Sequence, residues 1–260
     1  MSKNLIYCFS GSGNCLDIAK NIAKYLGDTD IVMMRSFPAV TNALEAERVG
    51  FVFPCHAGGL PGKVEQYVKS VSVGPNTYRF AVVSYAGYPG VGLKKIDDIV
   101  KLDYWTGISH HCSAIWLFPH KLMLPTLSVR QAQKRSERLA AKAAADILEK
   151  KHRSGHPSAF FLNALEAKAW PMLSRKKAEA LTADDKCISC GQCEKICPAG
   201  NIRIQGGKPQ FGSSCIGCLS CLQYCPVQAI NMGGATLKRE RYHNQNIYAA
   251  ELMKSIIHID

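Results

Sequence analysis

The chain has 260 residues, 47% of them hydrophobic, and a net charge of +12 from 32 basic and 20 acidic side chains. This composition predicts a packed core, with room for one large domain and one small one. No stretch approaches the roughly 20 apolar residues that span a bilayer, and the N-terminus lacks the apolar run and cleavage site of a signal peptide. We therefore expect a cytoplasmic protein. Its twelve cysteines then favour metal ligation over disulfides, because the cytosol keeps thiols reduced.

The first predicted element is a strand at residues 4–9, followed by a loop of small residues. Apolar residues from Leu16 to Leu26 then recur at three- and four-residue steps, which predicts a helix. A strand, a small-residue loop and a helix place backbone N–H groups around a phosphate. The loop is not a P-loop, because no Gly-Lys-Ser/Thr follows, and Leu16 occupies the third glycine position of the dinucleotide fingerprint. A plain strand–turn–helix without a ligand is the alternative.

Further strands are predicted along the first part of the chain, at residues 30–34, 48–54, 78–84 and 113–118. Helical patterns fall between several of them, and this alternation predicts a parallel sheet covered on both faces. The clearest of these helices are at residues 64–71 and 91–102. Open parallel sheets bind ligands at the C-terminal ends of their strands. Two glycine-rich loops, 54–61 and 84–90, follow strands there, as expected where the backbone approaches a ligand closely.

The first loop, Ser10-Gly11-Ser12-Gly13-Asn14-Cys15, resembles the flavodoxin phosphate loop Ser/Thr-x-Thr/Ser-Gly-Asn-Thr, with a cysteine replacing the last hydroxyl. The resemblance implies an α/β fold with a flavodoxin-like, doubly wound, five-stranded parallel sheet. It also implies FMN as a cofactor, with hydroxyls and amides of this loop on the phosphate and the two glycine-rich loops around the isoalloxazine ring. The residues so assigned to FMN are Ser10, Gly11, Ser12, Gly13, Asn14, Cys15, Pro54, His56, Ala57, Gly58, Gly59, Ser84, Tyr85, Gly87 and Tyr88.

One departure from flavodoxins concerns the aromatic residues around the ring. Flavodoxins commonly place an aromatic side chain on each face of the flavin, but the first glycine-rich loop here has no Trp or Tyr. Tyr85 or Tyr88 is expected on one face, with the other face open; the alternative is that both are loop or core residues. His56 is expected at the flavin edge, or else as an exposed loop histidine. We expect FMN to cover Cys15, at a helix N-terminus that can lower a thiol pKa.

The next segments predict a connection between two domains. Residues 127–151 are rich in Ala, Leu, Lys, Arg and Glu and should form the last helix of the first domain. Gly155 and Pro157 follow as helix stop signals. Residues 160–180 are expected to be helical up to Trp170-Pro171, with aromatic side chains that pack between the domains. His110 and His111, which have no evident metal partners, are interpreted as structural.

Eight cysteines near the C-terminus form two copies of Cys-x-x-Cys-x-x-Cys-x-x-x-Cys-Pro. The spacing resembles bacterial two-cluster ferredoxins, in which three cysteines of a run bind one [4Fe–4S] cube and the fourth binds the other. Zinc knuckles and disulfides are the alternatives, but zinc sites usually pair two CxxC units across a longer gap. The resemblance implies a cluster I site of Cys187, Cys190, Cys193 and Cys225, and a cluster II site of Cys215, Cys218, Cys221 and Cys197.

The whole chain resembles flavodoxin–ferredoxin fusion proteins. Between the cysteine runs, residues 202–211 predict a hairpin, and apolar residues in the tail suggest a helix folded back on the body. The expected organisation is a flavodoxin-like FMN-binding domain at 1–153, a connector at 154–182, a small α+β two-cluster ferredoxin domain at 183–234 and a helical tail at 235–260.

We expect electron transfer between FMN and the two [4Fe–4S] clusters, converting two-electron into one-electron transfer for a redox partner protein. One alternative is an FMN-dependent oxidoreductase of a small organic substrate, fed by the clusters; another is a redox or oxygen sensor. Part of the basic surface, from residues 121–177 and 238–241, is expected to dock an acidic partner. No nucleic-acid motif accompanies this charge. Oxygen-sensitive clusters fit anaerobic metabolism, and the oligomeric state is not indicated.

Overall fold

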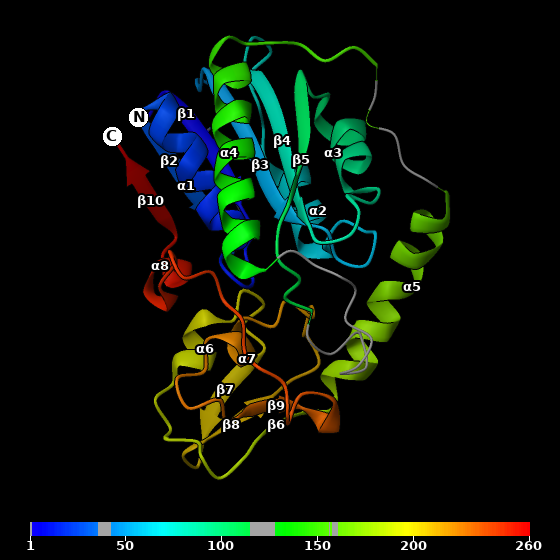
Figure 1. The fold of residues 1–260 in the computed structure, drawn as a ribbon, viewed down its shortest axis with the longest axis vertical. Coiled ribbons are helices and arrows are strands. Elements are labelled where there is room, and N and C mark those ends of the chain that lie inside the picture. Colours follow the sequence, from blue (N-terminus) through cyan, green and yellow to red (C-terminus); the bar gives the residue numbers. More distant parts are fainter. Residues whose placement is uncertain (1, 36–42, 115–127, 156, 158–160) are drawn as a thin grey trace.

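The computed structural model describes residues 2–35, 43–114, 128–155, 157 and 161–260 (Figure 1). Neighbouring strands β1 to β5 pair in parallel, in the order β2-β1-β3-β4-β5. This is the flavodoxin-like doubly wound order, so the predicted fold class is confirmed. The five strands are β1 (Asn4–Cys8), β2 (Thr29–Met33), β3 (Arg48–Pro54), β4 (Tyr78–Tyr85) and β5 (Tyr104–Ser109).

Helices cover both faces of this sheet, because successive side chains of a strand point to opposite faces. Ile6 and Cys8 of β1 pack with α1 (Asn14–Leu26) and α4 (Val129–Leu148). Leu5 and Tyr7 pack on the other face with α2 (Gly62–Ser70), and the same core includes α3 (Gly92–Val100). No helix in the described part of the chain is both long and apolar enough to cross a membrane.

The fifth strand was placed wrongly from the sequence. It lies at Tyr104–Ser109 and pairs with β4 from Phe80↔Tyr104 to Tyr85↔Ser109. Ser113 and Ala114 are not in a strand, and residues 115–118 of the predicted strand lie outside the described residues. Tyr104, Trp105 and Ile108 of the true strand are buried. Thr106 and Gly107 lie between them, so the strand has no continuous apolar run and was not recognised in the sequence.

The tail forms a strand rather than a long helix. Its helix, α8 (Ala249–Met253), has only five residues. β10 (Ile256–Ile259) then pairs antiparallel with β2, with Ile257 opposite Ile31. The sheet therefore has six strands, and Figure 1 shows both chain ends at this edge. Pairing satisfies backbone groups that the edge of β2 would otherwise expose to water.

The cysteine-rich part packs at the end of the sheet to which the parallel strands point (Figure 1). The predicted hairpin at 202–211 is confirmed. The connector helix α5 (Phe161–Ala178) runs past Pro171, where it was expected to end. An internal proline removes one backbone hydrogen bond and crowds the carbonyl four residues earlier, so it favours the end of a helix without requiring it. The domain boundaries stay a prediction. The remaining elements are β6 (Leu181–Ala183), α6 (Gln192–Ile196), β7 (Ile202–Gln205), β8 (Lys208–Phe211), α7 (Ser220–Gln223), β9 (Ile230–Met232) and the 3-10 turn η1 (Gly233–Ala235).

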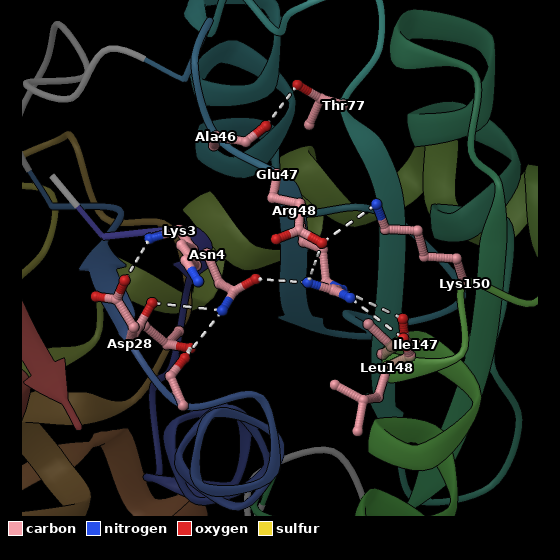
Figure 2. A network of polar contacts seen from close by, with 12 residues as sticks. Lys3, Asn4, Asp28, Ala46, Glu47, Arg48, Thr77, Ile147, Leu148 and Lys150 are labelled. Atoms are coloured by element: carbon pink, nitrogen blue, oxygen red, sulfur yellow. Dashed lines mark hydrogen bonds and ion pairs between the residues drawn. The ribbon is translucent and has the colours of Figure 1, made fainter.

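Arg48, at the start of β3, fastens the end of α4 to the sheet (Figure 2). Its guanidinium donates to the carbonyls of Ile147 and Leu148, at 3.4 and 3.2 Å, and to Asn4 Oδ1 at 3.4 Å. The last carbonyls of a helix have no partner within the helix. Arg48, 8% exposed, therefore replaces water at this helix end.

Arg48→Ala should lower the free energy of unfolding by about 2–3 kcal/mol, because it leaves several buried oxygens without a donor. Urea unfolding followed by circular dichroism measures this change. The matched control is Arg130→Ala, an exposed arginine on α4, which should change stability by less than about 0.5 kcal/mol. Equal effects of the two substitutions would contradict the anchoring role of Arg48.

Candidate functional site

A cavity of about 470 Å³ lies at the C-terminal ends of the sheet strands. Its volume is within the range of small-molecule and cofactor sites. All the residues predicted to contact FMN line it, except Gly13 and Gly59. Gly13 instead forms the turn into α1 with φ +92°, and a Cβ on Gly59 would lie 3.0 Å from the Cβ of Ala167 in α5. The structure thus brings the three predicted loops together around one space.

The first loop enters the N-terminus of α1, which favours an anion. Ser10 Oγ accepts from the backbone N–H of Leu16 at 3.4 Å, and Asn14 Oδ1 accepts from the Tyr242 hydroxyl at 2.8 Å. The side chain of Asn14 is therefore held by the tail. Burial raises the pKa of the Cys15 thiol well above its ordinary value, although its position at a helix N-terminus suggested the opposite shift. Cys15 is a protonated wall residue.

Two polar atoms in the cavity lack a protein partner among the described residues. They are Nδ1 of His56 and Oγ of Ser109, both shielded from solvent. Burial lowers the pKa of His56 to about 4, so its imidazole is neutral at pH 7. A buried polar atom without a hydrogen bond is costly. The polar edge of a flavin carries both donors and acceptors and could supply a hydrogen bond to each of these two atoms. The burial of His56 is not consistent with the alternative expectation of an exposed loop histidine.

The connector helix supplies a wall that the sequence did not reveal. Trp170 of α5 lines the cavity, with its ring centroid 6.2 Å from that of His56. Glu166, one turn earlier, accepts a hydrogen bond from the hydroxyl of Tyr88 in the second glycine-rich loop. Trp170 thus places an aromatic side chain beside the first glycine-rich loop, which has no Trp or Tyr.

His110 and His111 also line the cavity. Nδ1 of His110 accepts from the backbone N–H of His111 at 2.8 Å, and its Nε2 lies 3.2 Å from Oε1 of Gln133. Burial lowers the pKa of His110. Both histidines directly follow β5, and residues at the C-terminal end of a parallel strand are expected at the ligand site. They were not predicted there because the fifth strand had been placed at residues 113–118.

The cysteines gather into two separate hollows. One is lined by Cys187, Cys190, Cys193 and Cys225, and the other by Cys197, Cys215, Cys218 and Cys221. These are the two crossed sets that the spacing implied. Backbone N–H groups point at three of the sulfurs: Asn201 at Cys197 (3.3 Å), Gly217 at Cys215 (3.5 Å) and Ala229 at Cys225 (3.3 Å). Such donors favour the thiolate form that binds iron, so the residues present fit two clusters.

The cavity and the cluster II site share a wall. Cys218 lines both, and its backbone oxygen would lie 2.2 Å from a Cβ placed on Gly11. Ser220 Oγ donates to the Gly11 carbonyl at 3.0 Å, and the Tyr224 hydroxyl donates to the Ser12 carbonyl at 3.3 Å. The phosphate loop and the second cysteine run are thus hydrogen-bonded to each other.

Residues 186–230 match the 4Fe-4S dicluster domain family. The eight cysteines therefore belong to a two-cluster iron–sulfur domain. A stretch of 34 residues is 50% identical to NADH-quinone oxidoreductase subunit I 1 of Syntrophobacter fumaroxidans, covering 13% of this chain and 23% of that relative.

Solved structures resemble the first part of the chain at low identity. An FMN-dependent NADH-azoreductase from Bacillus anthracis, in complex with FMN, has a TM-score of 0.39 and 10% identity over 57% of this chain and 100% of its own. A Fusobacterium nucleatum flavodoxin bound to flavin mononucleotide has a TM-score of 0.41 and 12% identity over 58% of this chain and 99% of its own.

Proposed function

We propose that the protein transfers electrons between FMN bound in the cavity and the two [4Fe–4S] clusters, converting two-electron into one-electron transfer. One observation carries this proposal: Cys218 lines both the cavity and the cluster II site. Its neighbours Gly217 and Leu219 line both as well, so one short segment separates the two places where the redox groups would sit, and no large movement is needed between them.

The chain's own residues divide the work of the FMN site. The N-terminus of α1 and the small residues before it suit the phosphate, while His56 and Ser109 offer hydrogen bonds to the polar ring edge. Trp170 and Tyr85 supply apolar walls that exclude water. When bound, FMN exchanges electrons in pairs or singly, whereas each cluster exchanges one at a time.

The cysteines define an order from the cavity outwards. Cys218 lies at the cavity wall, whereas Cys190 of the cluster I site is exposed and its neighbour Ile188 is 62% exposed. We therefore assign exchange with a partner protein to the cluster I face. The proposed order is cavity, cluster II, cluster I and partner, or the reverse.

An acidic partner fits the charge of the surface. Arg130, Lys134 and Arg138 are exposed at four-residue spacing along α4. This row is on the sheet domain and not among the residues that line the cluster I hollow, so it would attract an acidic partner without forming the docking face itself. Such charge mainly accelerates encounter. A cytoplasmic location belongs to the same proposal, because it keeps the cluster cysteines reduced.

A second candidate is an FMN-dependent oxidoreductase of a small organic substrate. The observation that favours it is that the cavity extends to His110, His111 and Arg135, beyond the loops assigned to FMN. Rapid, saturable turnover of a small organic oxidant would favour this function over the carrier.

Cofactor content tests the proposal directly. Protein purified without oxygen should contain about eight iron atoms and about one FMN per chain. Released FMN and total iron should be measured on one preparation, before and after incubation with added FMN. Full iron with no FMN bound, even after the addition, would overturn the flavin half of the proposal and favour a simple cluster carrier or sensor.

A further inference from the structure

Arg35 crosses from the sheet to the cluster II site. It follows β2, and Nη1 donates to the carbonyls of Ile196, at 3.1 Å, and Leu252, at 2.6 Å. Nη2 donates to the carbonyl of Lys195. These bonds hold the guanidinium at the end of α6, whose next residue is the cluster ligand Cys197. Figure 1 shows α6 and α8 together below the edge of the sheet from which Arg35 comes.

The guanidinium lies beside the cluster II ligand Cys197, because it binds the carbonyl of the preceding residue, Ile196. Burial lowers the pKa of Arg35, while the negative charges of Cys197 and Cys218 raise it. A cation of the flavodoxin-like sheet domain therefore lies beside one cluster site.

The cluster II site is also the more buried of the two. None of the four cluster II cysteines is exposed, whereas Cys190 of the cluster I site is exposed. One-electron reduction makes a cluster one unit more negative. Burial opposes this gain of charge and nearby cations favour it.

The cations beside the cluster I site have carboxylates close by. Cys225 and Asp184 both raise the pKa of Arg241, against the larger effect of burial, and Lys208 is paired with Asp185 at 2.8 Å. Arg35 therefore differs from these cations, since the partners of its guanidinium are backbone carbonyls and no carboxylate among the described residues affects its pKa.

We propose that Arg35 is a positioning residue that raises the reduction potential of cluster II and thereby offsets its burial. The electron that enters cluster II comes from reduced FMN in one direction of flow and from cluster I in the other. The inference rests on the proposed function only for the place of cluster II in the relay. The potential itself depends on the cluster and not on FMN.

The test is a redox titration of the full-length, cluster-loaded protein, followed by electron paramagnetic resonance. Arg35→Gln should lower one of the two cluster potentials and leave the other unchanged. Arg35→Lys should restore most of the wild-type value because it keeps the charge. Lys69→Gln, at the exposed far end of α2, is the matched control and should change neither potential.

Assignment of the shifted cluster uses Cys190→Ala, which removes a cluster I ligand and leaves the cluster II signal. In that background Arg35→Gln should still shift the remaining potential. Unchanged potentials in Arg35→Gln would overturn the proposal, as would an equal decrease in Arg35→Lys, since lost hydrogen bonds and not lost charge would then be the cause. Absence of FMN would refute the proposed relay, but the effect of Arg35→Gln on the cluster potential could still be measured.

Discussion

Cys218→Ala should remove cluster II, about four of the eight iron atoms, and stop electron transfer between FMN and the surface. Cys218 is the cluster ligand that also lines the cavity proposed for FMN. The other three ligands of the site, Cys197, Cys215 and Cys221, cannot supply a fourth thiolate, so one iron of the cube loses its protein ligand. FMN should remain bound, because the loops that carry its predicted contacts are unchanged.

The measurement combines iron and FMN content with the rate at which the FMN-reduced protein reduces cytochrome c, a one-electron acceptor. Cys112→Ala is the matched control, since Cys112 lines the same cavity but lies outside both cysteine runs. It should retain all the iron and the wild-type rate. An unchanged rate in Cys218→Ala, despite the loss of iron, would contradict a relay through cluster II.

Features that depend on short stretches of chain were predictable from the sequence. The resemblance of the cysteine runs to two-cluster ferredoxins implied two crossed ligand sets, and the structure gathers the cysteines into those sets, because each run of three surrounds one site and the fourth reaches the other. The strands β1, β3 and β4 were also predicted within a residue of their ends, since each is an apolar run bounded by a turn or a charge.

Features that depend on distant partners were not predictable. β10 becomes a strand because the edge of β2, more than 200 residues earlier, offers it backbone hydrogen bonds. From the sequence, Trp170 was expected only to pack between the two domains. It lines the cavity because α5 packs against the glycine-rich loops. No periodicity in the sequence carries information about such contacts.

Gly11 is the clearest case of a residue whose importance comes from a distant partner. Its loop position suggested only a contact to phosphate, yet a Cβ there would lie 2.2 Å from the backbone oxygen of Cys218. The position of a Cβ is fixed by the backbone, and the oxygen of Cys218 is itself a backbone atom, so no side-chain rotation can relieve this contact. Gly11→Ala should therefore force apart the phosphate loop and the cluster II loop, at a cost of about 1–3 kcal/mol.

That separation should affect both sites at once. We expect FMN to bind about tenfold more weakly in Gly11→Ala, equivalent to about 1.4 kcal/mol, and transfer between FMN and cluster II to slow, because the shared wall is the contact that shifts. FMN titration by fluorescence and the cytochrome c assay measure the two effects. Gly62→Ala, where an added Cβ meets nothing within 4 Å, is the matched control and should change neither. Weaker FMN binding with an unchanged transfer rate would show that the phosphate loop and the cluster II loop act independently.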